Sequence, residues 1–150
     1  MNLHLKNMNE STEVFIDANV LIYYLDETSE KHPTVMAILQ QLVDNNTYLY
    51  TSHHVLEEVL FIISKLSSKK EITFLAVQEI SLIPNLVLVE PSADFEFAER
   101  YTQLYQESKV GINDTLLLQL ILDAKIPRLF TYDKELIKQA NLLGIKQIYD

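Results

Sequence analysis

The stretch VFIDANVLI, residues 14–22, decides the fold of this chain. Its first three residues are apolar and β-branched or aromatic, as in the central strands of a parallel sheet. A carboxylate, Asp17, stands where the strand stops, and an apolar run of helical character follows it. A charge at the end of a buried strand is costly unless a partner, a proton or a metal ion neutralises it. The stretch therefore predicts a strand, a polar site and a helix, in that order.

Short apolar strands alternate with helical segments along the rest of the chain. Strands are expected at residues 14–16, 48–50, 86–89, 128–131 and, at a sheet edge, 146–149. Helices are expected at residues 19–25, 33–43, 53–66, 71–82, 93–105, 114–124 and 133–143, the third capped by Ser52 and the last closed by Gly144. Strands joined by helices imply crossover connections and helices on both faces of the sheet. We therefore predict an α/β fold: a three-layer α/β/α sandwich around a mainly parallel sheet of four or five strands.

Composition places the chain among globular proteins. Its 150 residues are 48% hydrophobic, which predicts one domain over residues 1–150 with a loose start at residues 1–12. There is no Cys, so thiolate metal sites and disulfides are excluded. The polar start has no apolar leader, and no run approaches the ~18 residues of a membrane span. These features predict a cytoplasmic protein that does not associate with membranes.

The formal charge of −9 argues against a broad basic surface for nucleic acid. It does not exclude a nuclease, because clustered catalytic acids hold divalent cations. Any face that binds RNA then needs a local basic patch.

Three aspartates are expected near one edge of the sheet or facing its core. Asp17 and Asp133 each follow a predicted strand, and ligands of open parallel sheets bind beyond the carboxyl ends of the strands. Asp133 and Asp114 also sit at predicted helix starts, where the helix dipole favours negative charge. At ~100° per residue, each of these two leads an apolar stripe that faces the core. All three carboxylates are therefore candidates for one site.

The third helix offers two further acids, Glu57 and Glu58. Val55, Val59 and Ile62 mark the centre of its apolar face. Glu58 lies ~60° from Val55 around the helix and Glu57 ~160° away, so Glu58 is the one that can reach inward.

Each acid also has an ordinary structural interpretation. Asp133 alone can be a helix N-cap, Asp114 alone a dipole partner in a helix capped by Asn113, and Glu58 alone a surface residue. Together they point to a cation site, because converging carboxylates raise one another's pKa unless a cation lies among them. Oxygen ligands without Cys suit Mg²⁺ or Mn²⁺.

The ordered set of motifs resembles the PIN-domain ribonucleases. It comprises Asp17-Ala-Asn19, Thr51-Ser52 with Glu58 six residues after the serine, Asn113-Asp114 before an apolar helix, and Thr131-Tyr132-Asp133. Length and order of elements are most similar to the toxins of VapC-type toxin–antitoxin pairs. One departure is bulk: Leu60-Phe61-Ile62 stands where many toxin members have a small residue.

The resemblance implies residue roles. Asp17, Glu58 and Asp114 match the metal-binding catalytic acids, and Asp133 matches a more variable fourth acid that would share both roles. Asn19, Thr131 and Ser52 match positions that support the cluster or contact substrate. The resemblance implies a Mg²⁺- or Mn²⁺-dependent endoribonuclease with an antitoxin partner.

Two other readings stay open: a non-catalytic PIN-like binding module, and an aspartyl-phosphate or receiver-type domain with Asp17 as the acceptor. The second needs a late-strand lysine and an acid flanking Asp17, and the sequence supplies neither.

Two surface features bear on partners. Lys65 lies ~20° from Glu58 around the third helix, and Lys109 precedes Asp114, so both are candidates for phosphate contacts, with ordinary surface lysines as the alternative. Apolar residues also extend beyond the face that one core needs, which suggests a homodimer interface or, alternatively, a deeper core. They are Leu60, Phe61, Ile63, Phe74 and Val77.

Overall fold

The computed structural model describes residues 13–148 of the chain. The expected loose start at residues 1–12 and the last residues of the final expected strand lie outside the described part. Within it, a five-stranded sheet has the order β3-β2-β1-β4-β5, and every neighbouring pair is parallel. The strands are β1 (Glu13–Ile16), β2 (Tyr48–Thr51), β3 (Leu86–Leu88), β4 (Arg128–Phe130) and β5 (Lys146–Gln147).

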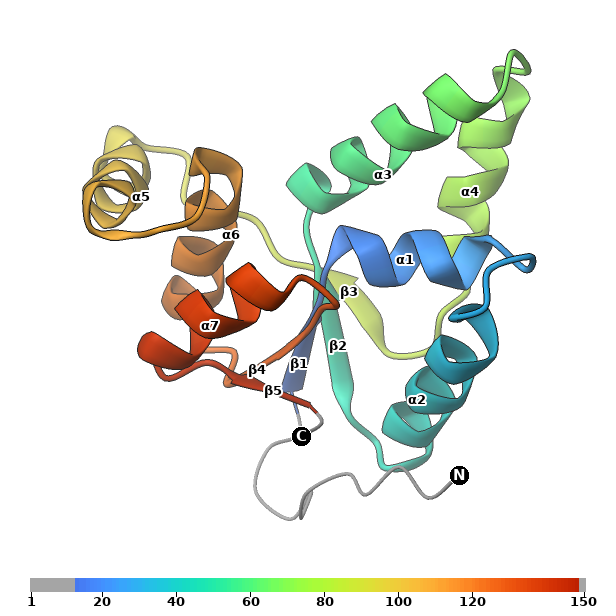
Figure 1. Ribbon diagram of the computed structural model, residues 1–150, viewed down its shortest axis with the longest axis horizontal. Coiled ribbons are helices and arrows are strands. Elements are labelled where there is room, and N and C mark those ends of the chain that lie inside the picture. Colours follow the sequence, from blue (N-terminus) through green and yellow to red (C-terminus); the bar gives the residue numbers. More distant parts are fainter. Residues whose placement is uncertain (1–12, 149–150) are drawn as a thin grey trace.

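Helices cover both sides of this sheet. Figure 1 shows α1 to α4 on one side and α5 to α7 on the other, which confirms the predicted three-layer α/β arrangement. The helices are α1 (Ala18–Leu25), α2 (His32–Asp44), α3 (His53–Leu66), α4 (Glu71–Ser81), α5 (Phe95–Glu107), α6 (Ile112–Asp123) and α7 (Lys134–Leu142).

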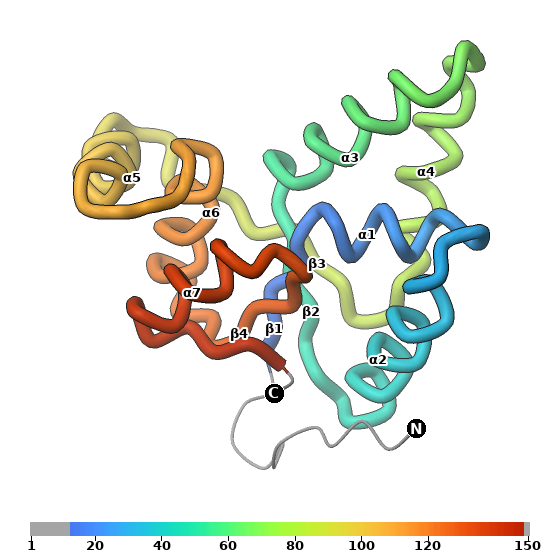
Figure 2. Tube along the Cα trace, viewed as in Figure 1, coloured from blue at the N-terminus to red at the C-terminus, as the bar shows by residue number. Residues whose placement is uncertain are grey.

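The strand order changes direction between β1 and β4. From β1 the chain moves outward through β2 to β3, then returns to place β4 on the other side of β1. Phe15 is therefore paired with Tyr50 on one side and with Leu129 on the other. The trace in Figure 2 shows α1 and α7 starting close to each other, just beyond these strands. The carboxyl ends of β1 and β4 thus form the switch point at which open α/β sheets bind ligands.

Two helix starts differ from the sequence prediction by two residues, and three others by one. α5 begins at Phe95, because the Asp94 carboxylate accepts a hydrogen bond from the Phe97 backbone N–H (3.2 Å) and so caps the helix there. α6 begins two residues early, at Ile112, because the Gly111 carbonyl accepts the Thr115 N–H (3.0 Å). Asn113 is therefore inside α6 and does not cap it, while Asp114 stays in its first turn.

The end of α7 is as predicted. Gly144 has φ +81°, its N–H donates to the Asn141 carbonyl (3.1 Å), and the Ile145 N–H donates to the Ala140 carbonyl (2.9 Å). This pair of bonds is the Schellman motif, which needs the left-handed conformation that glycine adopts without strain.

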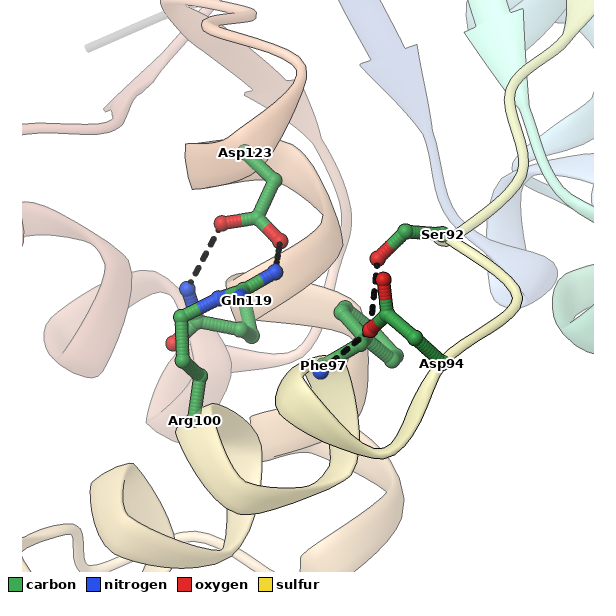
Figure 3. Close-up of polar contacts among 6 residues, drawn as sticks. All are labelled: Ser92, Asp94, Phe97, Arg100, Gln119 and Asp123. Carbon is green, nitrogen blue, oxygen red and sulfur yellow. Dashed lines mark hydrogen bonds and ion pairs between the residues drawn. The ribbon is translucent and has the colours of Figure 1, made fainter.

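The core lies on both faces of the sheet, and on one of them it is formed with α6. Phe15 and Phe130 of the sheet are fully buried, as are Leu118 and Ile121 of α6. Figure 3 shows how the far end of α6 is held against α5: Asp123 pairs with Arg100 (2.7 Å) and accepts a hydrogen bond from Gln119 (2.9 Å). The ion pair holds the C-terminal end of α6 against α5. Asp114 lies at the other end of the same helix, in its first turn. No helix in residues 13–148 is long and apolar enough to cross a bilayer.

Candidate active site

Asp17 is a buried carboxylate at the switch point. It is 7% exposed and caps α1, with Oδ1 accepting the Ala18 N–H at 2.8 Å. Oδ2 accepts the Thr131 hydroxyl at 2.7 Å, and the Asp17 N–H donates to the Phe130 carbonyl at 3.1 Å. Burial raises its pKa, the bonds from Thr131 and Ala18 lower it, and the charge of Asp133 raises it again; the net shift is upward. Hydrogen bonds thus hold the Asp17 carboxylate in place, but none of these partners carries a positive charge.

Thr131 connects the ends of β1 and β4. Its hydroxyl donates to Asp17 and accepts from the Asn19 amide (3.1 Å) and from the Asp133 N–H (3.1 Å). These three bonds use the full capacity of a hydroxyl group. Asn19 also reaches the carboxylate of Asp17 (3.5 Å), and its oxygen accepts the Tyr132 N–H (3.2 Å). Thr131 and Asn19 therefore fix the orientation of Asp17.

Asp133 is the N-cap of α7. Its Oδ1 accepts the N–H groups of Glu135 (2.9 Å) and Leu136 (3.1 Å), so the ordinary interpretation as a helix cap is confirmed. Capping does not remove it from the site, because its charge raises the pKa of Asp17, Glu58 and Asp114.

Glu58 and Asp114 approach from opposite layers. Burial raises the pKa of Asp114 to about 6, with further contributions from Asp133 and Asp17. Burial also raises the pKa of Glu58, and the charges of Asp17, Asp114 and Asp133 raise it further. The four carboxylates come from four separate elements and lie close enough to repel one another. Glu58, the glutamate selected by its rotation around the helix, is thus electrostatically coupled to all three aspartates.

The four carboxylates suit a hard divalent cation, although their side chains are not arranged as a complete set of metal ligands. Within residues 13–148 no group of three or more His, Asp or Glu side chains is arranged to hold a metal ion. The potential ligands are all carboxylate oxygens, as Mg²⁺ and Mn²⁺ prefer. Burial raises the pKa of Glu58 and Asp114, and the charges of neighbouring acids raise it further; a cation among them would relieve that repulsion.

The other residues predicted for the site lie at varying distances from its chemistry. Ser52 is fully buried, and its hydroxyl accepts the Val55 N–H at 3.2 Å, so it caps α3, which carries Glu58. Lys65 lies in the last turn of α3, with its ammonium 5.2 Å from the Phe61 ring centroid. Lys109 is exposed, and its backbone N–H donates to Gln139 (3.4 Å). The structure brings neither ammonium into a described contact with the carboxylates.

Sequence reasoning missed two participants around Thr131. The Tyr132 N–H donates a hydrogen bond to the Asn19 side-chain oxygen. The ammonium of Lys31, in the loop before α2, lies over the Tyr132 ring. Neither contact has a local signal, because each joins segments that lie far apart along the chain.

This combination of a parallel sheet with a switch-point cluster of acids defines a known class, and the chain belongs to the PIN domain family, whose model matches residues 14–142. Among curated relatives, the chain is similar to "Ribonuclease VapC1" of Aquifex aeolicus (strain VF5). The two are 28% identical over 108 residues, which cover 71% of each chain.

Three solved structures share the fold. VapC20 of Mycobacterium tuberculosis, described as a Sarcin-Ricin loop cleaving toxin, superposes with a TM-score of 0.65 at 14% identity, covering 91% of this chain and 99% of that one. VapBC2 of Rickettsia felis, bound to a DNA fragment from its promoter, gives a TM-score of 0.63 at 20% identity, covering 90% and 96%. FitAcB of Neisseria gonorrhoeae gives 0.61 at 13% identity, covering 90% and 96%.

Proposed function

We propose that this protein is a metal-dependent endoribonuclease, the toxin of a toxin–antitoxin pair, acting on RNA in the cytoplasm. One observation supports the proposal: four carboxylates from separate elements are brought together at the switch point of a PIN fold, where burial and the charges of neighbouring acids raise the pKa of Asp17, Glu58 and Asp114. The similarity to a VapC ribonuclease supports RNA as the substrate.

Each residue has a distinct role in the proposed reaction. Asp17, Glu58 and Asp114 would hold Mg²⁺ or Mn²⁺, with Asp133 as a fourth acid. The cation, when bound, supplies the charge that activates water and stabilises the phosphoryl oxygens. Thr131 and Asn19 hold the Asp17 carboxylate in one orientation, so that little reorganisation is needed when substrate arrives. Water is the nucleophile, so the RNA 2′-hydroxyl takes no part.

Substitution of the acids tests this function. Asp17→Asn and Asp114→Asn each remove a negative charge at nearly constant volume. We expect Mn²⁺-dependent cleavage of single-stranded RNA to fall by roughly a thousandfold or more in either variant. Asp44→Asn, at the exposed C-terminal end of α2, is the matched control and keeps wild-type cleavage. Far-ultraviolet circular dichroism checks that each variant is folded, and unchanged cleavage by a folded Asp114→Asn protein contradicts the proposal.

A non-catalytic binding module is the second candidate, favoured by the lack of a finished metal cage in the described residues. Titration calorimetry separates the two. A nuclease takes up Mn²⁺ with a measurable heat that disappears in Asp114→Asn. A module gives no heat and no rise in melting temperature with Mn²⁺.

An apolar groove of about 350 Å³ between α1, α3 and α4 is the proposed antitoxin site. Its walls include Ile22, Ile63, Leu66 and Leu75, which together offer an apolar surface that an amphipathic segment can fill. We expect the product of a small reading frame beside the gene to co-purify with this protein, and Ile63→Glu to prevent it.

A homodimer is proposed through the outer faces of α3 and α4. Phe61 and Phe74 are 64% and 65% exposed, so the alternative of a deeper core is wrong for these two residues. Exposed aromatic rings of this size mark an interface more often than a free surface. Light scattering during size-exclusion chromatography measures the oligomeric state.

A further inference from the structure

Lys31 lies against two aromatic rings, one of which belongs to Tyr132, the residue between Thr131 and Asp133. It is exposed at the start of α2, and its ammonium is 4.4 Å from the Tyr132 ring centroid and 5.8 Å from that of Tyr23. The two rings meet edge to face, with centroids 5.5 Å apart and planes at 75°. Attraction between the cation and the ring faces holds the lysine in place. These three residues form what we call the Lys31 ledge.

The ledge is joined to the site through the backbone. Tyr132 lies between Thr131 and Asp133, and its N–H donates to Asn19, whose amide in turn contacts Asp17. A movement of the Tyr132 backbone would therefore disturb the bonds that orient Asp17. The ammonium of Lys31 stands one side chain away from this network.

The charge of Lys31 remains available to a ligand. The ion pairs among residues 13–148 are His53–Glu90, Arg100–Asp123 and Lys138–Glu135, and none includes Lys31. An ammonium has three N–H donors, and contact with ring faces leaves room for a strong acceptor on the solvent side. A positive group on the face that an RNA strand crosses would offset part of the repulsion between its phosphates and the carboxylates.

We propose that Lys31 binds a backbone phosphate of the RNA strand as it enters the carboxylate site, an inference that rests on the proposed function. The ledge takes a phosphate and not a base, because Lys31 covers the Tyr132 ring and Phe130 packs against the same ring with centroids 5.7 Å apart. A phosphate contact carries no sequence information. Lys31 thus contributes equally to the binding of RNAs of different sequence.

Steady-state cleavage of two single-stranded RNAs of unrelated sequence, each labelled with a fluorophore, tests the ledge in the presence of Mn²⁺. We expect Lys31→Gln to raise KM roughly five-fold on both RNAs and to leave kcat within about two-fold, as for lost uniform binding. The slope of log(kcat/KM) against log salt becomes shallower by about 0.7, the value for one phosphate on a single strand. Lys31→Arg should have a KM close to that of the wild type, because arginine keeps the positive charge.

Lys146→Gln is the matched control, since Lys146 is exposed at the start of β5 and pairs with Arg128 at the amino end of β4, whereas Tyr132 follows the carboxyl end of β4. It should change neither KM nor the salt slope. If Lys31→Gln lowers kcat at constant KM, the lysine only positions Tyr132 and the phosphate contact is refuted. If wild type cleaves RNA and Lys31→Gln matches it in KM and salt slope, the ledge is refuted while the nuclease stands. If wild type cleaves neither RNA with Mn²⁺, both proposals fail together.

Discussion

The edge where β1 and β4 end and the arm formed by α3 and α4 are built on opposite principles. At the edge, polar groups are buried and satisfied: Thr131 is fully buried, Asp17 is 7% exposed, and each makes hydrogen bonds to neighbouring backbone or side-chain groups. On the arm, apolar groups are exposed: Leu66 is 80% and Phe74 65% accessible. The first region shields the Asp17 carboxylate from water, whereas the second exposes apolar side chains to water.

The contrast indicates what each region lacks. The edge gathers four carboxylates, and burial together with the charges of neighbouring acids raises the pKa of Asp17, Glu58 and Asp114, so a bound cation would stabilise their ionised forms. The exposed apolar surface of the arm would be covered by the proposed partners. Catalysis and partner binding are therefore expected to respond to separate sets of substitutions.

The two adjacent glutamates of α3 provide the largest expected effect. Glu58→Gln removes a charge that is coupled to the three aspartates, so Mn²⁺-dependent cleavage should fall by roughly a hundredfold or more. Glu57 is exposed, as Glu58 is, but leaves α3 in a direction ~100° away, so Glu57→Gln should leave the rate within about two-fold. A gel assay of RNA cleavage measures both. Equal losses in the two variants would show that α3 does not direct Glu58 to the edge.

Thr131 tests the hydrogen-bond network without touching a proposed ligand. Thr131→Val keeps the shape and removes three hydrogen bonds, so cleavage should fall about 10–100-fold. Thr131→Ser keeps the hydroxyl and should restore most of the rate. If valine and serine act alike, the orientation of Asp17 does not depend on this hydroxyl.

The arm should tolerate changes that the edge does not. Replacing both Phe61 and Phe74 with Ser removes exposed rings, so self-association should weaken by about tenfold or more. RNA cleavage per folded monomer should stay within about two-fold. Sedimentation velocity and the cleavage assay together check this separation. A parallel loss of cleavage would mean that the partner copy completes the site.

The smallest expected effect concerns stability without metal. Asp114 has a folded pKa of about 6 against an ordinary value of 3.8, so the folded state holds its proton more tightly than the unfolded state does. Its contribution to stability is therefore full at low pH and is lost as the pH rises through about 6. In EDTA, we expect the melting temperature to be about 2–4 °C higher near pH 5 than near pH 7.5, relative to Asp114→Asn. Differential scanning fluorimetry measures this. A pH profile of Asp114→Asn identical to that of wild type would contradict it.

Much of this architecture was predictable because it follows from short-range rules. An apolar strand that ends in Asp17 implies a switch-point acid, and helical rotation distinguishes Glu58 from Glu57. Gly144 predicts the end of α7, because glycine adopts the left-handed conformation found there without strain. The predicted starts of α5 and α6 were wrong. Several polar or small residues near each start can cap the helix, and packing decides which of them does so.

The support of the site was less accessible from sequence. Periodicity places Asp133 beyond β4, but only the folded chain shows that its carboxylate caps α7 and still acts on Asp17. The contact of Lys31 with Tyr132 depends on how the loop after α1 meets the end of β4, which no local pattern encodes.

The bond between Thr131 and Asp17 spans 114 positions of the chain and has a consequence for synthesis. Contacts between distant segments form late, since a long loop must close before they are gained. A chain still emerging from the ribosome has β1 and α3 long before β4 exists to orient Asp17. The ribonuclease proposed here would therefore be inert while it is being made, and would acquire its activity only when β4 docks beside β1.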